Sequence, residues 1–443
     1  MGAKILNILL IVGITFFTSC ATKHVLPRKH HKPLAEMIEE SPVFNTYFTG
    51  FALYDPAAGK MLYQQNADKY FTPASNTKIF TFYTAQQVLG DSLPLLHYIT
   101  QGDSLIFWGA GNPLVLHPDF NSTHLAVEFL QNQDRKLFFS TSNFKEDHFG
   151  TGWAWDDYSY RYQAEKGPFP LYGNLVRLKT DSLDYLVRAS PDYFQAYLRY
   201  TDKEESPTYR REQTGQVIHL NRTKTSQDSS FEVSIPFDDN PDLTVALLQD
   251  ALQKPVRRWL SGMLPDSTWQ TLRQPVNDTI YRRLLHPSDN FIAEQLLLMC
   301  SDKLFGDLNT SQMIEHARDS LLNDLPDPLE WWDGSGLSRY NMFTPRTITA
   351  LLNKIYAELP RERIFDLFPA GGVSGTIQNW YGAEKPYVFA KTGTLRNKHC
   401  LSGFLLTQSG RVLIFSFMHN NYTRSSSEIK KEMQRVLELV RSF

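Results

Sequence analysis

The sequence has little cysteine, no excess charge of either sign and only one long hydrophobic run. Three cysteines in 443 residues are too few for a disulfide-stabilised scaffold. The 45 basic and 47 acidic side chains give a net charge of -2, which argues against a nucleic-acid partner because such binding needs concentrated positive charge. The sequence contains no zinc-ligand spacing and no glycine-rich phosphate loop. We therefore expect a globular protein without a metal or cofactor.

The one long hydrophobic run lies at the N-terminus, over residues 5–17. It is too short to span a bilayer comfortably, and it has the layout of a secretory signal. Two small residues then precede Cys20, which resembles the lipobox of bacterial lipoproteins. We expect a signal peptide over 1–19, a lipidated Cys20, and a basic tether over 20–34 that joins the protein to a membrane. The alternative is an ordinary signal peptide with an incidental cysteine.

The other two cysteines, Cys300 and Cys400, lie far apart in the remaining chain. We expect two separate buried thiols rather than a disulfide. With the predicted export signal, the protein would be periplasmic and held at a membrane by its lipid, the outer membrane in a Gram-negative cell.

The stretch FTPASNTKIFT, residues 71–81, places Ser75 three positions before Lys78. The apolar residues that follow have helix-like spacing, so the two side chains should share one face at a helix N-terminus. There the helix dipole favours negative charge near the serine oxygen. A serine hydroxyl needs a base before it can attack, and a lysine shielded from water has a lowered pKa and can act as that base. The pair occurs by chance in many helices, so further motifs must support it.

Two further motifs follow in the chain. Ser288-Asp289-Asn290 precedes apolar residues at helical spacing, and the segment 391–394, Lys-Thr-Gly-Thr, ends a strand-like run. This order of motifs resembles the set shared by penicillin-binding proteins and serine β-lactamases. Each motif is weak by itself, but together they indicate one active site.

Other stretches narrow the resemblance to class C low-molecular-mass penicillin-binding proteins, the peptidase S13 family of D-alanyl-D-alanine carboxypeptidases and endopeptidases. They include GNPLV at 111–115, GWAWDDY at 152–158, DGSGLSRYN at 333–341 and GGVSGTI at 371–377. The resemblance implies a mixed α/β (α+β) transpeptidase fold like that of penicillin-binding proteins and serine β-lactamases, with a β-rich inserted region.

The gap from Ser75 to Ser288 is long and contains short strand-like runs broken by turns. We therefore divide the chain into a first catalytic part over 35–100, an insert over 101–264, and a second catalytic part over 265–443.

The resemblance also implies roles. Ser75 would attack the carbonyl of the penultimate D-Ala and Lys78 would be its base. Ser288 would relay a proton between Lys78 and the departing amine. Asn290 would bind the substrate backbone and help hold Lys78, and Lys391 would supply positive charge.

The remaining roles concern the last motif. Thr392 and Thr394 would bind the terminal carboxylate of the substrate. Gly393 would let the strand approach the substrate closely. The backbone N–H groups of Ser75 and Thr394 would form the oxyanion hole.

The family's equivalent of GWAWDDY receives the third residue of the stem peptide. By this resemblance Asp157, with Asp156 as the weaker choice, would pair with the ammonium of diaminopimelate. Trp155 and Tyr158 would form the pocket wall.

The expected partners are peptidoglycan stem peptides and β-lactams, which would inhibit covalently. The residues leave carboxypeptidase and endopeptidase activity open. A second hypothesis also stays open, that of a slow penicillin-binding lipoprotein that mainly binds the wall or recruits other wall enzymes.

Overall fold

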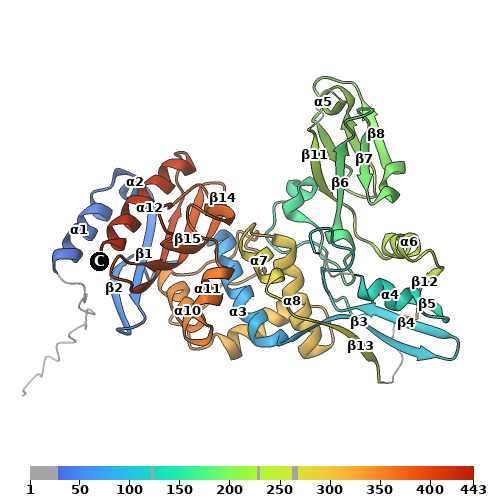
Figure 1. Cartoon of the computed structure of the whole chain (residues 1–443), viewed down its shortest axis with the longest axis horizontal. Coiled ribbons are helices and arrows are strands. Elements are labelled where there is room, and N and C mark those ends of the chain that lie inside the picture. Colours follow the sequence, from blue (N-terminus) through green and yellow to red (C-terminus); the bar gives the residue numbers. More distant parts are fainter. Residues whose placement is uncertain (1–27, 121–123, 227–229, 262–267) are drawn as a thin grey trace, which may run out of the picture.

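The computed structural model describes residues 28–120, 124–226, 230–261 and 268–443. The chain forms an elongated molecule, with the C-terminus and helix α1 at one end and the inserted region at the other (Figure 1). Residues 1–19 and Cys20 lie outside the described part, as does most of the predicted tether. None of the helices in the described ranges is long and apolar enough to cross a membrane.

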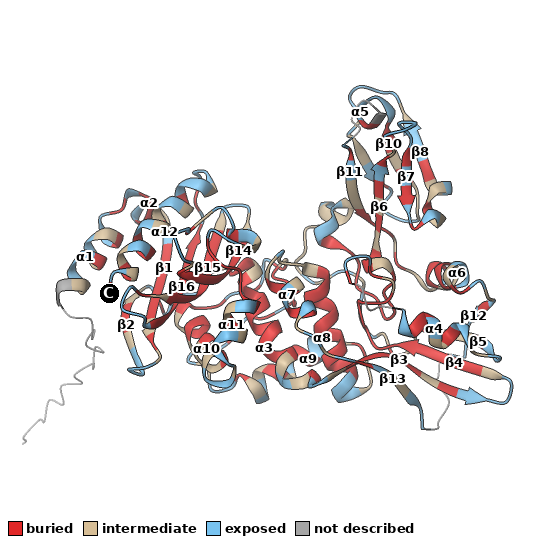
Figure 2. Ribbon diagram, in the orientation of Figure 1, coloured by how far each residue is buried: buried red, intermediate tan, exposed pale blue. Residues whose placement is uncertain are grey.

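An antiparallel five-stranded sheet organises the catalytic part, with strand order β14-β15-β16-β1-β2. Its strands are β1 (Phe48–Asp55), β2 (Lys60–Gln65), β14 (Val388–Leu395), β15 (Lys398–Leu406) and β16 (Val412–Asn420). Successive side chains of a strand point to opposite faces, so Phe389 packs into one hydrophobic cluster while Val388 and Ala390 pack into another. The sheet is therefore buried on both faces, as Figure 2 shows.

Helices near the chain ends cover one face of this sheet. They are α1 (Arg28–Glu39), α2 (Pro42–Thr46) and α12 (Ser426–Arg441). Helix α12 begins at a capping box made by Ser425 and Glu428 and buries one apolar stripe. The predicted tether over 20–34 is too long, because the chain is already helical from residue 28, the start of α1. Leu34 and Ile38, one turn apart, are fully buried and hold this helix on the domain.

A helical layer covers the other face and carries two of the motifs. It contains η1 (Ala74–Thr77), α3 (Lys78–Leu89), α7 (Thr279–Leu285), α8 (Asn290–Phe305), α9 (Thr310–His316), η6 (Ala317–Leu321), α10 (Pro345–Glu358), α11 (Arg361–Leu367) and η7 (Gly375–Ile377). Helix α8 is buried along most of its length (Figure 2). Asp289 caps it by accepting a hydrogen bond from the Ile292 N–H, which fixes Asn290 as its first residue.

The inserted region begins with a second five-stranded sheet, ordered β12-β5-β4-β3-β13. Its elements are β3 (Ser92–Gln101), β4 (Ser104–Gly109), α4 (Leu125–Gln131), β5 (Lys136–Ser140), α6 (Pro241–Leu252), β12 (Val256–Arg258) and β13 (Gln270–Pro275). Strands β3 and β13 pair with each other, so both belong to the insert. The structure thus moves the predicted borders at 101 and 264 outward, to about the start of β3 and the end of β13.

A smaller unit projects from the insert (Figure 1). It contains two three-stranded sheets, β8-β10-β9 and β11-β6-β7. Its elements are η4 (Tyr172–Asn174), β6 (Leu175–Thr180), β7 (Val187–Ser190), η5 (Asp192–Tyr197), β8 (Leu198–Thr201), β9 (Tyr209–Arg211), β10 (Ile218–Asn221), α5 (Arg222–Ser226) and β11 (Glu232–Pro236). Two short turns, η2 (Trp155–Ser159) and η3 (Arg161–Gln163), follow β5 in the sequence and precede this unit.

Gln295 joins helix α8 to the insert. Its fully buried amide donates to the carbonyls of Gly111 and Gly167 and accepts from the Gly167 N–H. A buried amide with satisfied hydrogen bonds holds such a contact firmly, because breaking the contact would leave buried polar groups without hydrogen-bond partners. The insert is therefore held directly against the helix that begins at Asn290. Cys300 and Cys400 are both free and buried, which confirms the prediction of two separate thiols.

Candidate active site

Ser75 lies in the short turn η1 and Lys78 is the first residue of α3. The Lys78 Nζ is 3.0 Å from the Ser75 Oγ. The residue before the serine, Ala74, has φ 48°, a left-handed backbone conformation that costs energy for a residue with a side chain. The predicted serine–lysine pair is therefore formed in a strained turn at a helix N-terminus.

Lys78 is fully buried, and burial lowers the pKa of its amine to about 8, although the Asp333, Glu294 and Asp289 carboxylates act in the opposite direction. Its Nζ also donates to the Asn290 Oδ1 and to the Ser335 carbonyl, at 2.6 Å each. A neutral amine keeps two N–H bonds, which these two acceptors can hold. Its lone pair is then left to face the Ser75 hydroxyl.

Ser288 and Lys391 form the second half of the site. The Lys391 Nζ donates to the Ser288 Oγ and to the Thr392 carbonyl, at 2.8 Å each. Burial, together with the charge of Lys78, holds the Lys391 pKa well below its usual value. Ser288 has φ 62°, a second strained conformation. The structure pairs Ser288 with Lys391, whereas the motif resemblance pairs it with Lys78.

Gly393 lies directly against the nucleophile turn. A Cβ on Gly393 would lie 2.2 Å from the Pro73 carbonyl oxygen and 3.0 Å from the Ser75 nitrogen. The missing side chain therefore lets β14 pack closely against the nucleophile turn. Gly336 acts in the same way from another side, since its Cβ would lie 2.0 Å from the Ala74 oxygen.

The two threonines of the last motif differ in exposure. Thr392 is buried and its Oγ1 is 2.6 Å from the Thr376 Oγ1. Thr394 is exposed, and its Oγ1 is 2.9 Å from the Nδ1 of the buried His399. Burial lowers the His399 pKa to about 3, so the ring is neutral. β14 is an edge strand of its sheet, and its end at Thr394 lies beside the nucleophile turn.

The loop 333–338 also contributes to the site, although its residues belong to none of the three catalytic motifs. The Ser335 carbonyl accepts a hydrogen bond from Lys78. The backbone N–H groups of Ser335 and Gly334 donate to the Glu294 carboxylate. Asp333 accepts from the backbone N–H groups of Gly336 and Ser338. The DGSG sequence signals a tight loop, but a backbone carbonyl has no residue signature of its own.

The GWAWDDY block is partly brought to the site. The Trp153 indole donates to Asp333, at 2.9 Å. Burial and a hydrogen bond with Asp157 raise the pKa of Tyr162, and the Tyr162 carbonyl accepts from the Asn290 amide at 2.8 Å. Asp157 is thus linked to the catalytic motif through Tyr162.

The predicted wall residues, Trp155 and Tyr158, lie in η2 together with Asp157. Trp155 is 76% exposed. The Tyr158 ring lies under the Arg211 guanidinium, 5.3 Å from its centroid, so it packs toward the small projecting unit. Neither residue joins the cluster around Ser75.

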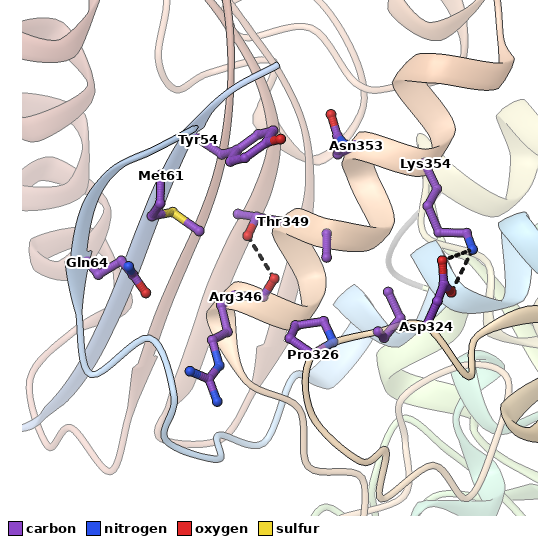
Figure 3. Close-up of a pocket in the computed structure, with 11 residues that line it drawn as sticks. Tyr54, Met61, Gln64, Asp324, Pro326, Arg346, Thr349, Asn353 and Lys354 are labelled. Carbon is purple, nitrogen blue, oxygen red and sulfur yellow. Dashed lines mark hydrogen bonds and ion pairs between the residues drawn. The ribbon is translucent and has the colours of Figure 1, made fainter. Parts of the chain in front are cut away.

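A hollow of about 240 Å³ adjoins the catalytic cluster and is lined by Tyr162, Ser288 and Asn290, among others. A second hollow of about 340 Å³ lies between β1, β2 and α10 (Figure 3). None of the motif residues lines it, and its Lys354 amine is already paired with Asp324. Only the first hollow belongs to the candidate active site.

A serine beside a buried lysine, with a second serine–lysine pair next to it, defines an acyl-transfer hydrolase of the serine type. The model of the D-Ala-D-Ala carboxypeptidase 3 (S13) family matches residues 30–440, and the chain belongs to that family. The predicted family is confirmed.

Curated relatives have similar length. The D-alanyl-D-alanine carboxypeptidase DacB of Haemophilus influenzae is 23% identical over 441 residues, which cover 89% of this chain and 90% of that protein. The D-alanyl-D-alanine carboxypeptidase of an Actinomadura species is also 23% identical, over 88% of this chain and 80% of its own. The crystal structure of penicillin binding protein 4 from Haemophilus influenzae has a TM-score of 0.73 and 20% identity, covering 93% of this chain and 99% of that one. This likeness confirms the predicted fold class.

Proposed function

We propose that the protein is a serine DD-peptidase that hydrolyses D-Ala-D-Ala peptides of peptidoglycan through an acyl-enzyme on Ser75. The observation that carries this proposal is the buried Lys78 amine, which has a lowered pKa and lies 3.0 Å from the Ser75 hydroxyl. Family membership supports the same reaction class.

In the acylation step, neutral Lys78 takes the Ser75 proton while Oγ attacks the carbonyl of the penultimate D-Ala. The bond between that carbonyl and the leaving amine breaks, and the amine needs a proton. Ser288 is placed to give it, because its hydroxyl accepts from Lys391 and can be reprotonated there. This path assigns the proton relay to Ser288 and Lys391.

In the deacylation step, water attacks the ester on Ser75. One water proton passes through Ser288 to Lys391, and protonated Lys78 returns its proton to the departing Ser75 oxygen. Both lysines then regain their starting states. The N–H groups of Ser75 and Thr394 form the proposed oxyanion hole.

We assign the substrate carboxylate to the exposed Thr394, assisted by Thr392 and the charge of Lys391. His399 supports this assignment if its proton is on Nδ1, since it then donates to the Thr394 Oγ1 and leaves the threonine proton for the carboxylate. The His399 Nε2 has no hydrogen-bond partner among the described residues. An unpartnered acceptor is better tolerated there than an unpartnered N–H, which favours the same tautomer.

For substrate choice we keep Asp157 as the group that pairs with the ammonium of a diaminopimelate side chain. Its link to Asn290 through Tyr162 supports this placement. The exposed Tyr162 ring replaces Trp155 and Tyr158 as the proposed wall.

We also propose that the chain is exported to the periplasm and lipidated at Cys20, on the basis of the apolar run and the residues before that cysteine. β-Lactams would acylate Ser75, and a related structure with TM-score 0.63 contains a β-lactam.

A product analysis tests the proposal. The protein is incubated separately with pentapeptide monomers and with cross-linked muropeptides, and the products are separated and weighed. Release of D-Ala from the first indicates carboxypeptidase activity, and cleavage of the second indicates endopeptidase activity. Binding without either product would instead support the slow penicillin-binding alternative.

A further inference from the structure

The segments on both sides of the 333–338 loop form a short two-stranded ribbon with an aromatic outer face. Glu330 and Met342 pair as an antiparallel bridge, with N–H to carbonyl distances of 3.3 and 2.8 Å. Side chains alternate strictly along both segments. The inward set is buried and comprises Leu329, Trp331, Asp333, Asn341 and Phe343, and the outward set is exposed and comprises Glu330, Trp332, Tyr340 and Met342.

The outward face is unusually apolar for an exposed surface. Trp332 is 44% exposed, Tyr340 is 54% exposed and Met342 is 41% exposed. The Trp332 and Tyr340 rings meet edge to face, with centroids 5.6 Å apart. Grouped exposed aromatic side chains mark binding surfaces more often than isolated ones do. We refer to Trp332, Tyr340 and Met342 as the aromatic platform.

The platform is rigid because its inner side is held by polar contacts. The Asn341 side chain accepts from the Trp332 N–H and donates to Asp333. The Trp331 indole donates to the Asp333 carbonyl. The rings are therefore presented on a fixed backbone, so that binding a ligand would cost little ordering of the protein.

The platform is joined to the active site through the 333–338 loop. It flanks the loop whose Ser335 carbonyl binds Lys78. On its other side the Arg339 N–H donates to the Gly152 carbonyl, and a Cβ on Gly152 would lie 3.1 Å from the Tyr340 ring. Next to Gly152, Phe149 adds a further partly exposed ring. A polymer whose peptide branch enters the cleft would therefore pass near these rings.

We propose that the aromatic platform binds the saccharide chain of peptidoglycan. This inference rests on the proposed function, because the occupant is the polymer that carries the peptide substrate. Pyranose rings present flat C–H faces that stack on tryptophan and tyrosine, and their hydroxyls need polar partners at the edge. Glu330 and the Tyr340 hydroxyl supply such partners beside the rings. A protein partner would be expected to seek a larger apolar area than one ribbon face.

The test compares binding to glycan with cleavage of soluble peptide. The whole chain is sedimented with insoluble glycan strands whose stem peptides have been removed, and its hydrolysis of a soluble acyl-D-Ala-D-Ala peptide is measured in parallel. The variant combines Trp332→Ala with Tyr340→Ala. The control is Tyr200→Ala, which removes a 41% exposed ring from β8 on the projecting unit (Figure 1).

The double variant should bind glycan at least about tenfold more weakly, as expected when central aromatic contacts are lost. The control variant should bind as the unmodified protein does, and all three should cleave the soluble peptide equally. Ser75→Ala should still bind glycan, which separates this inference from the catalytic proposal. Unchanged glycan binding by the double variant would overturn the inference. Two other results would also overturn it. One is a loss of binding by the double variant that appears only on glycan that still carries stem peptides, and the other is a loss of soluble-peptide cleavage equal to its loss of glycan binding.

Discussion

Replacing Gly393 by alanine should damage catalysis more than folding. The new Cβ would lie 2.2 Å from the Pro73 carbonyl oxygen and 3.0 Å from the Ser75 nitrogen. Both contacts are with backbone, which cannot rotate away as a side chain can. Restoring an ordinary contact requires β14 and the nucleophile turn to separate by about 1 Å, and such a displacement at a reacting group can cost about 100-fold in rate.

The expected result is a fall of about 100-fold in kcat/KM, together with a loss of about 1–3 kcal/mol in the free energy of unfolding from overpacking. Hydrolysis of an acyl-D-Ala-D-Ala peptide and chemical unfolding measure the two quantities.

Gly109→Ala is the matched control. Its Cβ would lie 1.8 Å from the Pro168 carbonyl oxygen at the end of β4 in the insert, an equally severe backbone contact away from Ser75. It should cost a similar unfolding free energy but change kcat/KM by less than about threefold. If Gly393→Ala kept normal kcat/KM, or if both variants lost activity equally, the reasoning about the nucleophile turn would be refuted.

Four further predictions concern the base, the substrate pocket and the lipid. The kcat/KM should rise with pH around a midpoint near 8, because burial lowers the pKa of the Lys78 amine to about 8 and only the neutral amine can take a proton; a profile flat from pH 6 to 9 would contradict this. At pH values between that pKa and the ordinary lysine pKa, Lys78 is protonated in the unfolded chain but not in the folded chain. Lys78 should therefore make the free energy of unfolding rise with pH over this range. Asp157→Asn should lower kcat/KM about ten- to hundredfold on diaminopimelate-containing peptides but much less on a simple acyl-D-Ala-D-Ala peptide, and equal losses on both would remove Asp157 from the pocket. Cys20→Ala should release the protein from membranes, and fatty-acid labelling that misses the unmodified protein would argue against the lipid.

Some elements of the fold have local signals in the sequence. The β1–β2 hairpin has short apolar strands separated by a turn, and the capping box at Ser425 precedes a regular apolar stripe. Both depend on neighbours in the chain, so their signals are local. Helix α1 was missed because its buried residues, Leu34 and Ile38, follow a basic segment that contains Pro33. Its stability comes from packing on the sheet domain, which the segment does not reveal.

In the candidate site, too, the sequence did not reveal features that depend on contacts between distant parts of the chain. Ser75, Lys78, Ser288, Asn290 and Lys391 have motif signatures, and the fold brings these five together. The role of Gly393 depends on Pro73, which lies more than three hundred positions earlier in the chain. The Ser335 contribution comes from its backbone carbonyl, which any residue possesses. Trp155 and Tyr158 were placed by block resemblance, and their side-chain directions depend on contacts with the insert.

The proposed mechanism depends most directly on the identity of the nucleophile. The protein is treated with a β-lactam, digested, and its peptides are weighed by mass spectrometry. We expect one adduct, on the peptide that contains Ser75, and none in Ser75→Ala, with the fold of that variant checked by thermal unfolding. An adduct on Ser288 or Ser335, or full labelling of the folded Ser75→Ala variant, would contradict the central claim.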